Sequence, residues 1–403
     1  MSVIGNVLSY FRQLWVGTPS SNPQGGRSDA GEYVEECDVL ALSAAWACLR
    51  LISGTIASLP LVVYRPTASG HPVVAKEHPL YRLLHRAPNP EQTVMDFWEG
   101  AIASIELKGN AIALKQRSVS GAIIGLEPMA WDHVSTRRRS DTDEIEYEYK
   151  GKRYAADDIL HIRGFGGSPL GGLSTIAMGV ATFGMAKAIN RSAAKMFASG
   201  VRSSGILTKE GTPFTAPQRA EAERLLREKY VGAMNAGVPM LLDNGLKWEA
   251  LSINPDDAQM LESRAFSVEE VCRMFGVPPH MIGHTDKSTS WGTGLEQQTL
   301  GFQKFALRPR LKRIETALEQ QLLTPADIAA GVTIEFNLEG LLRGDTVSRF
   351  QSYQTGLQNG IYTINEVRAK EGLPPVEGGD VPRMQMQNVP ITQAGQPVTA
   401  LAA

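Results

Sequence analysis

Hydrophobic positions in the first part of the chain repeat with helical spacing and then with strand spacing. Apolar residues at intervals of three and four predict a helix over residues 42–56, which Pro60 ends because proline cannot continue a helix. The run LVVYR (61–65) predicts a strand, and Thr93 predicts the N-cap of a second helix, over about 94–105. The body of the protein therefore opens with two helices on either side of a strand.

A block rich in strands follows. Turn residues separate short runs in which β-branched or aromatic residues alternate with polar ones, a pattern typical of antiparallel strands with one wet face. The predicted strands are residues 111–116, 122–127, 145–149, 152–154 and 158–163.

The next helix is unusual in its composition. Ser174 can cap it, Gly200 can end it, and the residues between them are crowded with alanine, glycine and serine. Its N-terminal half is apolar nearly all round, so neighbours must cover most of its faces, and small residues let those neighbours approach closely. Because one chain of this size has limited material to cover such a helix, the pattern indicates self-association.

A small α/β insert separates this helix from the next one. Asn244-Gly245 within it is the strongest hairpin signal in the chain. The predicted elements of the insert are a strand over 205–208, a charged helix over 217–230, and strands over 239–243 and 247–253.

A helix over 256–275 is followed by a short polar segment, DKSTSWGTG (286–294), which opens onto a long helix over 295–323. Pro309 in that helix removes one backbone hydrogen bond and clashes with the carbonyl of Phe305, so a kink is expected there. A strand over 332–336 and helices over 345–369, with Thr363 as a cap, complete the pattern.

The balance of basic and acidic residues limits the functions that this chain can have. The 403 residues are 43% hydrophobic, enough for two or three domains, and carry 40 basic against 42 acidic side chains, a net charge of −2. Proteins that grip nucleic acid usually show a basic excess, because neutralising phosphates supplies most of the affinity. Tight electrostatic binding of DNA or RNA is therefore not expected, nor is a polybasic membrane anchor.

The cysteines and the apolar stretches indicate the kind of cellular compartment in which the chain is made. Cys37, Cys48 and Cys272 are odd in number and far apart, without a CxxC pair, which indicates a reducing compartment during synthesis. The start of the chain has no pattern of a secretory signal. Pro169 and several glycines interrupt the longest stretch of low charge, so no transmembrane helix is expected.

Candidate chemistry is sparse. The glycine-rich loop 164–172 precedes a helix, where phosphates bind, but lacks the GK[ST] ending of a P-loop, so a strand-to-helix joint is favoured over a nucleotide site. His280 and His284 are four apart, but intervening and flanking Pro and Gly residues disrupt the register that a zinc site needs. The acidic residues that follow Arg137–Arg139 offset their charge, so a solvated strand edge or a subunit contact is favoured over a nucleic-acid patch. Trp291 is either a buried anchor of its loop or an exposed contact with a partner or ligand.

The motifs of the chain, taken in order, resemble the portal (head-to-tail connector) proteins of tailed bacteriophages. The resemblance runs from about Ala41 to Asp380 and rests on colinear order rather than on one motif. The segments that carry it are ALSAAWACLRLISGTIASLPLVVYR, HPLYRLLHRAPNP, LKGNAIALKQR, DDILHIRGF, the helix to MFASG, SGILT, FSVEEVCRMFGVPPHMIG and TINEVRAKEGLPPVEGGD.

This resemblance implies a structural protein without catalytic residues, cofactor or metal. Portals similar to this chain form a dodecameric ring at one capsid vertex, where the terminase large subunit pumps double-stranded DNA through the central channel and the DNA later leaves by the same route. Contacts with the major capsid protein and a head-tail adaptor are implied, without sequence-specific DNA contacts and without a membrane. Synthesis in the host bacterial cytoplasm and a final place in the virion follow from the same resemblance.

The resemblance also implies an α+β portal fold, with an α/β wing, a long-helix stem, a small α/β clip, a kinked long helix after a tunnel loop, and a small helical crown. The implied parts are an N-terminal helix and flexible arm (1–30), the first part of the wing (31–172), a stem helix (173–199), the clip (200–254), a second stem helix and turn (255–285), the tunnel loop (286–294), the kinked wing helix and strand (295–344), the crown helices (345–381) and a disordered tail (382–403).

Three groups of residues receive roles from this layout. Pro309 marks the helix kink, and Gly179, Gly184 and Ala188 are expected to pack the stem. The tunnel loop that would narrow the DNA channel comprises Asp286, Lys287, Ser288, Thr289, Ser290, Trp291, Gly292, Thr293 and Gly294. Two alternatives stay open: a nucleotide-dependent enzyme that uses the loop 164–172, and a scaffold or adaptor protein of the virion without a channel.

Overall fold

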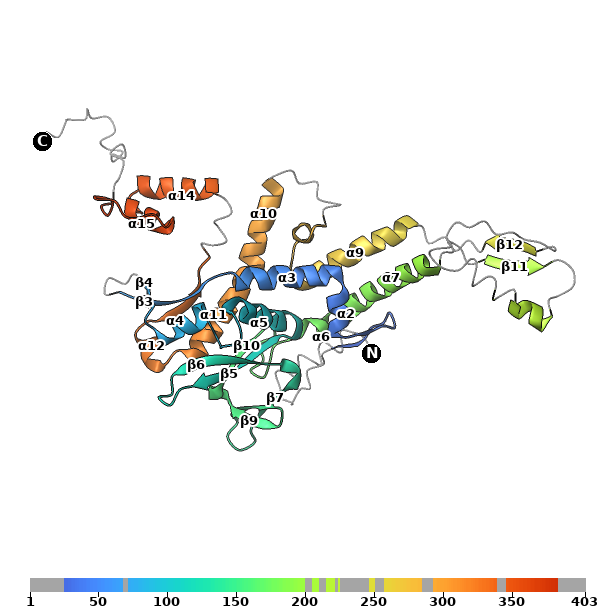
Figure 1. The fold of residues 1–403 in the computed structure, drawn as a ribbon, viewed down its shortest axis with the longest axis horizontal. Coiled ribbons are helices and arrows are strands. Elements are labelled where there is room, and N and C mark those ends of the chain that lie inside the picture. The colour runs from blue at the N-terminus through green and yellow to red at the C-terminus, as the bar shows by residue number, and fades with distance from the viewer. Residues whose placement is uncertain are drawn as a thin grey trace, which may run out of the picture. The chain divides into compact units, whose positions relative to one another are not determined.

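The structure is a computed structural model of the chain, divided into two compact units, Met1–Phe336 and Asn337–Ala403 (Figure 1). It describes residues 25–67, 72–199, 205–209, 215–221, 224, 246–250, 257–284, 293–338 and 346–382.

The first helices form where the apolar spacing predicts them. Helix α3 (Ser43–Ala57) follows the short α2 (Glu36–Ala41) and buries its apolar stripe against α5 (Val94–Lys108). Thr93 caps α5 as expected: its hydroxyl accepts the N–H of Asp96, and the Asp96 carboxylate accepts the N–H of Thr93. Gly109 ends the helix in the left-handed conformation (φ 77°) that glycine adopts without strain.

The first unit also contains several small antiparallel sheets. One sheet has the order β10-β5-β6, formed by Ile159–Arg163, Asn110–Arg117 and Ile123–Met129. A second has the order β13-β3-β4, formed by Thr333–Phe336, Leu61–Pro66 and Pro72–Val74. A third has the order β7-β8-β9, formed by Val134–Arg138, Ile145–Tyr149 and Lys152–Ala155. Every described pairing is antiparallel, so the class is α+β, as expected.

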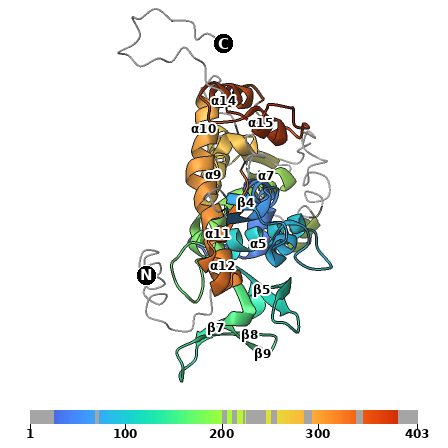
Figure 2. The same cartoon turned by 90° about the vertical axis from the view of Figure 1, so that its left-hand side faces the viewer.

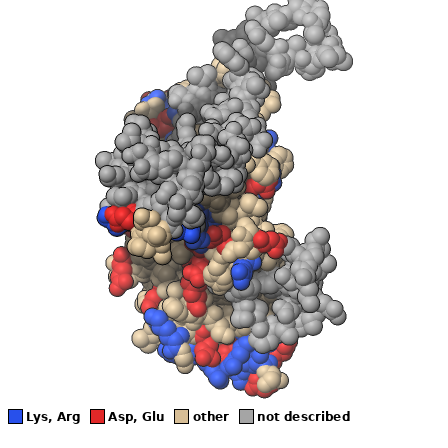
Figure 3. All heavy atoms as spheres, turned by 90° about the vertical axis from the view of Figure 1, so that its right-hand side faces the viewer, with Lys and Arg blue, Asp and Glu red and all other residues tan. Residues whose placement is uncertain are grey.

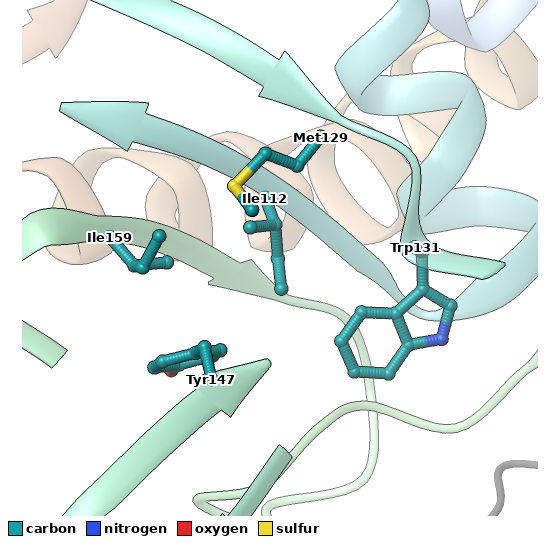
Figure 4. Packing of buried hydrophobic residues seen from close by; sticks show 5 residues of the cluster. All are labelled: Ile112, Met129, Trp131, Tyr147 and Ile159. Atoms are coloured by element: carbon teal, nitrogen blue, oxygen red, sulfur yellow. The ribbon is translucent and has the colours of Figure 1, made fainter. Parts of the chain in front are cut away.

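The first and third sheets share one hydrophobic core (Figure 4). Its buried members come from β5, β6, β8, β10 and the 3-10 turn η1 (Trp131–His133). They are Ile112, Met129, Trp131, Tyr147 and Ile159. Helix α5 packs on β5, and α11 (Arg308–Leu322) packs on β10, so helices cover the first sheet.

Two helices extend from this body. The helix expected from Ser174 is divided at Gly179 into α6 (Thr175–Met178) and α7 (Val180–Ser199), and the Ser174 hydroxyl caps α6 by accepting the N–H of Ala177. Helix α9 (Asp257–Phe275) packs along α7, and the turn η4 (Pro279–Ile282) follows it. Between α7 and α9, strands β11 (Gly205–Lys209) and β12 (Leu246–Ala250) pair with each other.

Shorter helices occur in both units. Helix α4 (Pro79–His85) packs on β3 and β6, and α12 (Pro325–Ala329) precedes β13. The second unit contains α14 (Thr346–Gln358) and α15 (Ile364–Lys370), and Thr363 caps α15 as predicted. No helix in the described ranges is long and apolar enough to cross a membrane.

The described end of the N-terminal arm, residues 25–30, differs from its prediction. Residues expected to belong to the flexible arm take part in a hairpin, in which β1 (Gly26–Arg27) pairs with β2 (Tyr33–Val34) and contacts α7. The boundary proposed at residue 30 therefore falls inside this hairpin. The contact with α7 lies about 150 residues away along the chain, so local composition could not reveal it. The Asn244-Gly245 hairpin lies outside the described residues.

Candidate functional site

The two helices expected to form a stem are in contact. Figure 1 shows α7 and α9 running alongside each other away from the sheets. The rings of Phe183 and Phe275 lie 6.2 Å apart between their centroids, and both side chains are buried. This aromatic contact anchors the pair at the end nearest the body, because Phe275 is the last residue of α9.

The small residues of the stem serve contacts within one chain. A Cβ added at Gly184 would lie 2.3 Å from the Cβ and Oγ of Ser28, on the N-terminal hairpin. At Gly179, an added Cβ would lie 2.5 Å from the ring of Phe183 and 2.9 Å from the carbonyl oxygen of Thr175. Within one chain these glycines admit the hairpin and a ring of the same helix, and their packing against a neighbouring subunit stays a prediction. Ala188 is half-buried.

Lys187 and Arg191 of α7 are paired with nearby carboxylates. The Lys187 ammonium lies 2.7 Å from a carboxylate oxygen of Asp38, and the Arg191 guanidinium lies 2.9 Å from Glu32. Burial acts to raise the pKa of the Asp38 carboxyl, but hydrogen bonds from Lys187 and from the Glu35 N–H outweigh it and lower that pKa below its usual value. These two basic residues of the stem are thus paired with acidic residues of the N-terminal hairpin and of α2.

The long helix after the polar segment is interrupted just before Pro309. Helix α10 (Thr293–Gly301) continues into a π-helical turn, Phe302–Leu307, and then into α11 (Figure 2). The N–H of Arg308 donates to the carbonyl of Gln303, five residues earlier, which is the π spacing. Since Pro309 has no N–H to donate to Phe305, the α spacing cannot be completed there. The irregularity expected at Pro309 thus takes the form of a π turn on its N-terminal side.

Arg310 connects this π turn to two other elements. Its guanidinium forms a two-pronged ion pair with Glu106 of α5, with N–O distances of 2.7 and 2.8 Å. The same group donates to the backbone carbonyls of Phe275 (2.8 Å) and Ala306 (2.9 Å). The pair is largely shielded from solvent, with 20% and 9% of the two side chains exposed. One side chain therefore joins the end of α9, the π turn and the helix over the sheet.

The tunnel-loop prediction can be placed only at its end. Residues 286–292, which include Trp291, lie outside the described ranges. Thr293 and Gly294 were expected in the loop, but they are the first two residues of α10. Helix α10 thus begins two residues earlier than predicted. A glycine in the first turn lowers the stability of a helix but does not prevent the helical conformation.

The glycine-rich loop is a tight joint. The N–H of Gly164 donates to the carbonyl of Gly109 at 2.6 Å, and the N–H of Gly172 donates to Oδ1 of Asn110 at 2.8 Å. A Cβ at Gly172 would lie 2.2 Å from the Gly109 carbonyl oxygen. These donors are used inside the chain, so the loop offers them to no phosphate, and the strand-to-helix joint is the interpretation that the geometry favours.

A buried polar network supports this joint. Oδ1 of Asn110 also accepts a hydrogen bond from Nε2 of His161 at 2.9 Å, and Nδ1 of His161 accepts the hydroxyl proton of Tyr147 at 3.0 Å. Burial, assisted by the nearby Arg163 charge, lowers the pKa of His161 well below its usual value, so the ring is neutral. The sequence indicates His161 only as part of a predicted strand, because its partners Asn110 and Tyr147 lie on two other strands.

The surface charges alternate in sign. Figure 3 shows Lys and Arg side chains interspersed with Asp and Glu on the described part of that face. Arg137 pairs with Glu146 across strands β7 and β8, and Arg138 and Arg139 each pair with an aspartate of the connecting turn. The arginine cluster is thus a neutralised strand edge, as the local charge pattern indicates.

Two cysteines that are far apart in the sequence are neighbours in the fold. The sulfur atoms of Cys48 on α3 and Cys272 on α9 lie 3.9 Å apart. Cys272 therefore contacts a thiol rather than completing a site with His280 and His284. No group of three metal-ligating side chains occurs among the residues that the structure describes.

Comparison with known proteins identifies the family. The phage portal protein family matches residues 43–372. The portal protein of Enterobacteria phage HK97 is 36% identical over 388 residues, which cover 94% of this chain and 91% of that protein. The probable portal protein of Streptomyces phage phiC31 is 34% identical over 379 residues, covering 90% and 81%.

Solved structures show the same fold. An HK97-family phage portal protein from Corynebacterium diphtheriae aligns with a TM-score of 0.57 at 19% identity, covering 77% of this chain and 99% of that one. A chain from the neck of a native gene transfer agent particle, computed with C12 symmetry, aligns with a TM-score of 0.56 at 23% identity, covering 93% and 100%. With the match of the family over most of its length, this chain belongs to the phage portal proteins.

Proposed function

We propose that twelve copies of this chain form a ring at one capsid vertex, and that the ring is the channel for packaging and ejecting double-stranded DNA. The observation that carries this proposal is the 36% identity with the HK97 portal protein along 94% of the chain. The neck of the native gene transfer agent particle, computed with C12 symmetry, supports the ring number.

The described surface of the stem suits a ring. Met185 on α7 and Phe266 on α9 are 53% and 57% exposed, although both are large and apolar. Neighbouring subunits in a ring would cover such side chains, which a lone chain leaves in water. The apolar composition of α7 was the sequence signal for self-association, and these side chains supply candidate contacts.

The near-neutral charge suits a channel through which DNA slides. A strongly basic channel would hold phosphates by counterion release and act as a brake. The net charge of −2 and the paired cations on α7 argue against such a grip. In this proposal the protein has no catalytic role, and the terminase large subunit supplies the energy for packaging.

The proposal includes further partners and locations. The major capsid protein would surround the ring, and a head-tail adaptor would dock on the clip at residues 200–254. The chain would be made in the host cytoplasm and would reside in the virion.

The ring is tested by the mass and the images of the purified protein. We expect a species of about 0.5 MDa by native mass measurement, the mass of twelve 43.7 kDa chains, with a central hole in negative-stain images. A monodisperse monomer at every salt and protein concentration would contradict the proposal. Rings without a hole would favour the alternative, a scaffold or adaptor of the virion without a channel.

The tunnel loop is tested separately. Deleting residues 286–294 is expected to leave ring assembly intact and to impair DNA packaging or retention. A glycine-serine segment of equal length is the matched control, because it keeps the spacing before α10 and removes Trp291 and Lys287. Loss of the ring itself on deletion would show that the loop is structural.

A further inference from the structure

Two thiols meet where the body of the molecule contacts the stem. Cys48 on α3 and Cys272 on α9 are separated by 224 residues in the chain, and their sulfur atoms lie 3.9 Å apart. Both side chains are buried, with 0% and 1% exposed. The third cysteine, Cys37 on α2, is exposed.

This distance is a van der Waals contact between two sulfur atoms. A disulfide bond needs an S–S distance of about 2.05 Å, so the sulfurs must approach by roughly 2 Å. Side-chain rotation can supply much of that movement, because α3 and α9 already pack against each other. The two sulfur atoms therefore need to move much less than those of two cysteines on separate surfaces would.

The two sulfurs are not equivalent. The thiol of Cys48 donates a hydrogen bond to the sulfur of Cys272. This hydrogen bond raises the pKa of Cys48, with burial adding to the effect, and lowers the pKa of Cys272. Cys272 is therefore the sulfur that ionises first, and a thiolate is the nucleophile in disulfide formation.

We propose that Cys48 and Cys272 form a redox-sensitive disulfide site that clamps α3 to α9. Diamide, a two-electron thiol oxidant, illustrates the balance. The Cys272 thiolate adds to its N=N bond and forms an S–N bond. The Cys48 thiolate then attacks that sulfur, so that the S–S bond forms, the S–N bond breaks, and the oxidant leaves as a hydrazine with the two hydrogens lost by the thiols.

The clamp has a consequence for the whole chain. A bond between these residues closes a loop of 224 residues and restricts the unfolded chain accordingly. It would also prevent α9 from moving away from α3. The pair stays reduced in a reducing compartment and becomes oxidised when the protein meets an oxidant outside it. This inference depends on the contact between the two helices and not on the proposed channel.

The test uses the full chain with Cys37→Ser, which removes the exposed thiol. After incubation with diamide over hours, we expect the mass to fall by about 2 Da, the two hydrogens of a single disulfide. After denaturation, neither remaining cysteine should react with N-ethylmaleimide until dithiothreitol is added. The apparent Tm should rise by about 5 °C, since closing a long loop stabilises the folded chain. The Cys37→Ser/Cys48→Ala chain is the matched control and should show none of these changes.

Two outcomes would overturn the proposal. One is that both cysteines of the diamide-treated Cys37→Ser chain still react with N-ethylmaleimide after denaturation, although the same treatment consumes the exposed Cys37 of the unaltered chain. The other is a disulfide that joins two chains, seen as a doubled mass without reductant. Because neither readout requires a variant at Cys48 or Cys272, a folding defect of the control cannot rescue or hide the result.

Discussion

At the scale of single residues, buried polar side chains determine how the segments of this chain are held together. His161 is completely enclosed, and both of its ring nitrogens have partners, Asn110 and Tyr147. Arg310 binds Glu106 and two backbone carbonyls from other elements. Leaving one partner of such a group unpaired costs more than the pair contributes.

The neutral state of His161 predicts a pH dependence. The unfolded histidine binds a proton below about pH 6.5, whereas the folded one, with its lowered pKa, does not. Stability from this residue is therefore present above about pH 6.5 and lost as the pH falls below it. Between pH 7.5 and 5.5 we expect a loss of about 1 kcal/mol in urea unfolding that is attributable to His161. His161→Gln should lack this component, and an unchanged pH slope in that variant would contradict the assignment.

The Arg310 contacts predict a large loss of stability on truncation. Arg310→Ala leaves Glu106 largely buried without its cation, so the free energy of unfolding should fall by about 3 kcal/mol. Arg308→Ala is the matched control, two residues away and exposed, with an expected change below about 0.5 kcal/mol. Thermal and urea unfolding measure both. Equal effects of the two substitutions would show that the ion pair does not hold the π turn.

At the scale of elements, the stem helix depends on the N-terminal hairpin. Gly184 and Ser28 approach so closely that the helix accepts the hairpin only because residue 184 has no side chain. In the π turn before Pro309, a missing group also determines the structure within one helix. Because Pro309 has no N–H, the backbone there adopts the π spacing instead of the α spacing.

The hairpin contact predicts a rescue by a second substitution. Gly184→Ala should destabilise the chain by about 1–3 kcal/mol, because the new Cβ collides with Ser28. Adding Ser28→Gly removes the two atoms that it meets and should recover most of that loss, so a double-mutant cycle will show a favourable coupling. A Gly184→Ala chain that folds normally, yet fails to form rings with or without Ser28→Gly, would instead place this glycine against a neighbouring subunit.

At the scale of the whole molecule, the charge distribution bears on how strongly the protein can bind DNA. Forty basic and 42 acidic residues give a net charge of −2, and the described cations of α7 and β7 are paired with carboxylates. In the proposed ring, these paired side chains would offer few free cations to a phosphate backbone.

This balance predicts a weak salt dependence. For assembled rings, the slope of log affinity for duplex DNA against log salt concentration should be shallower than about −3, because each neutralised phosphate contributes about −0.9. Fluorescence anisotropy over a salt series measures the slope. A slope near −10, typical of proteins that neutralise many phosphates, would show that the channel grips DNA.

Much of the fold was predictable from local patterns. The helix at 43–57, the capped starts at Thr93, Ser174 and Thr363, and strands β5, β6, β8, β9 and β10 follow from apolar spacing and cap chemistry, which act over a few residues. Strand β7 (Val134–Arg138) was not among the predicted strands. The candidate site was less predictable. Pro309 indicated an irregular helix, but the form of that irregularity depends on which donors the backbone carbonyls find. One of these donors is the Arg310 side chain, which bonds the carbonyl of Ala306.

Local sequence therefore determined the elements, the absence of a basic excess, and the colinear order of motifs that identifies a portal protein. Tertiary structure alone decided which distant residues meet: Cys48 with Cys272, Glu106 with Arg310, and Ser28 with Gly184. The physical reason is the range of the interactions. Spacing and capping are set within one or two turns, whereas these contacts join segments between 156 and 224 residues apart, which only the packing of the folded chain brings together.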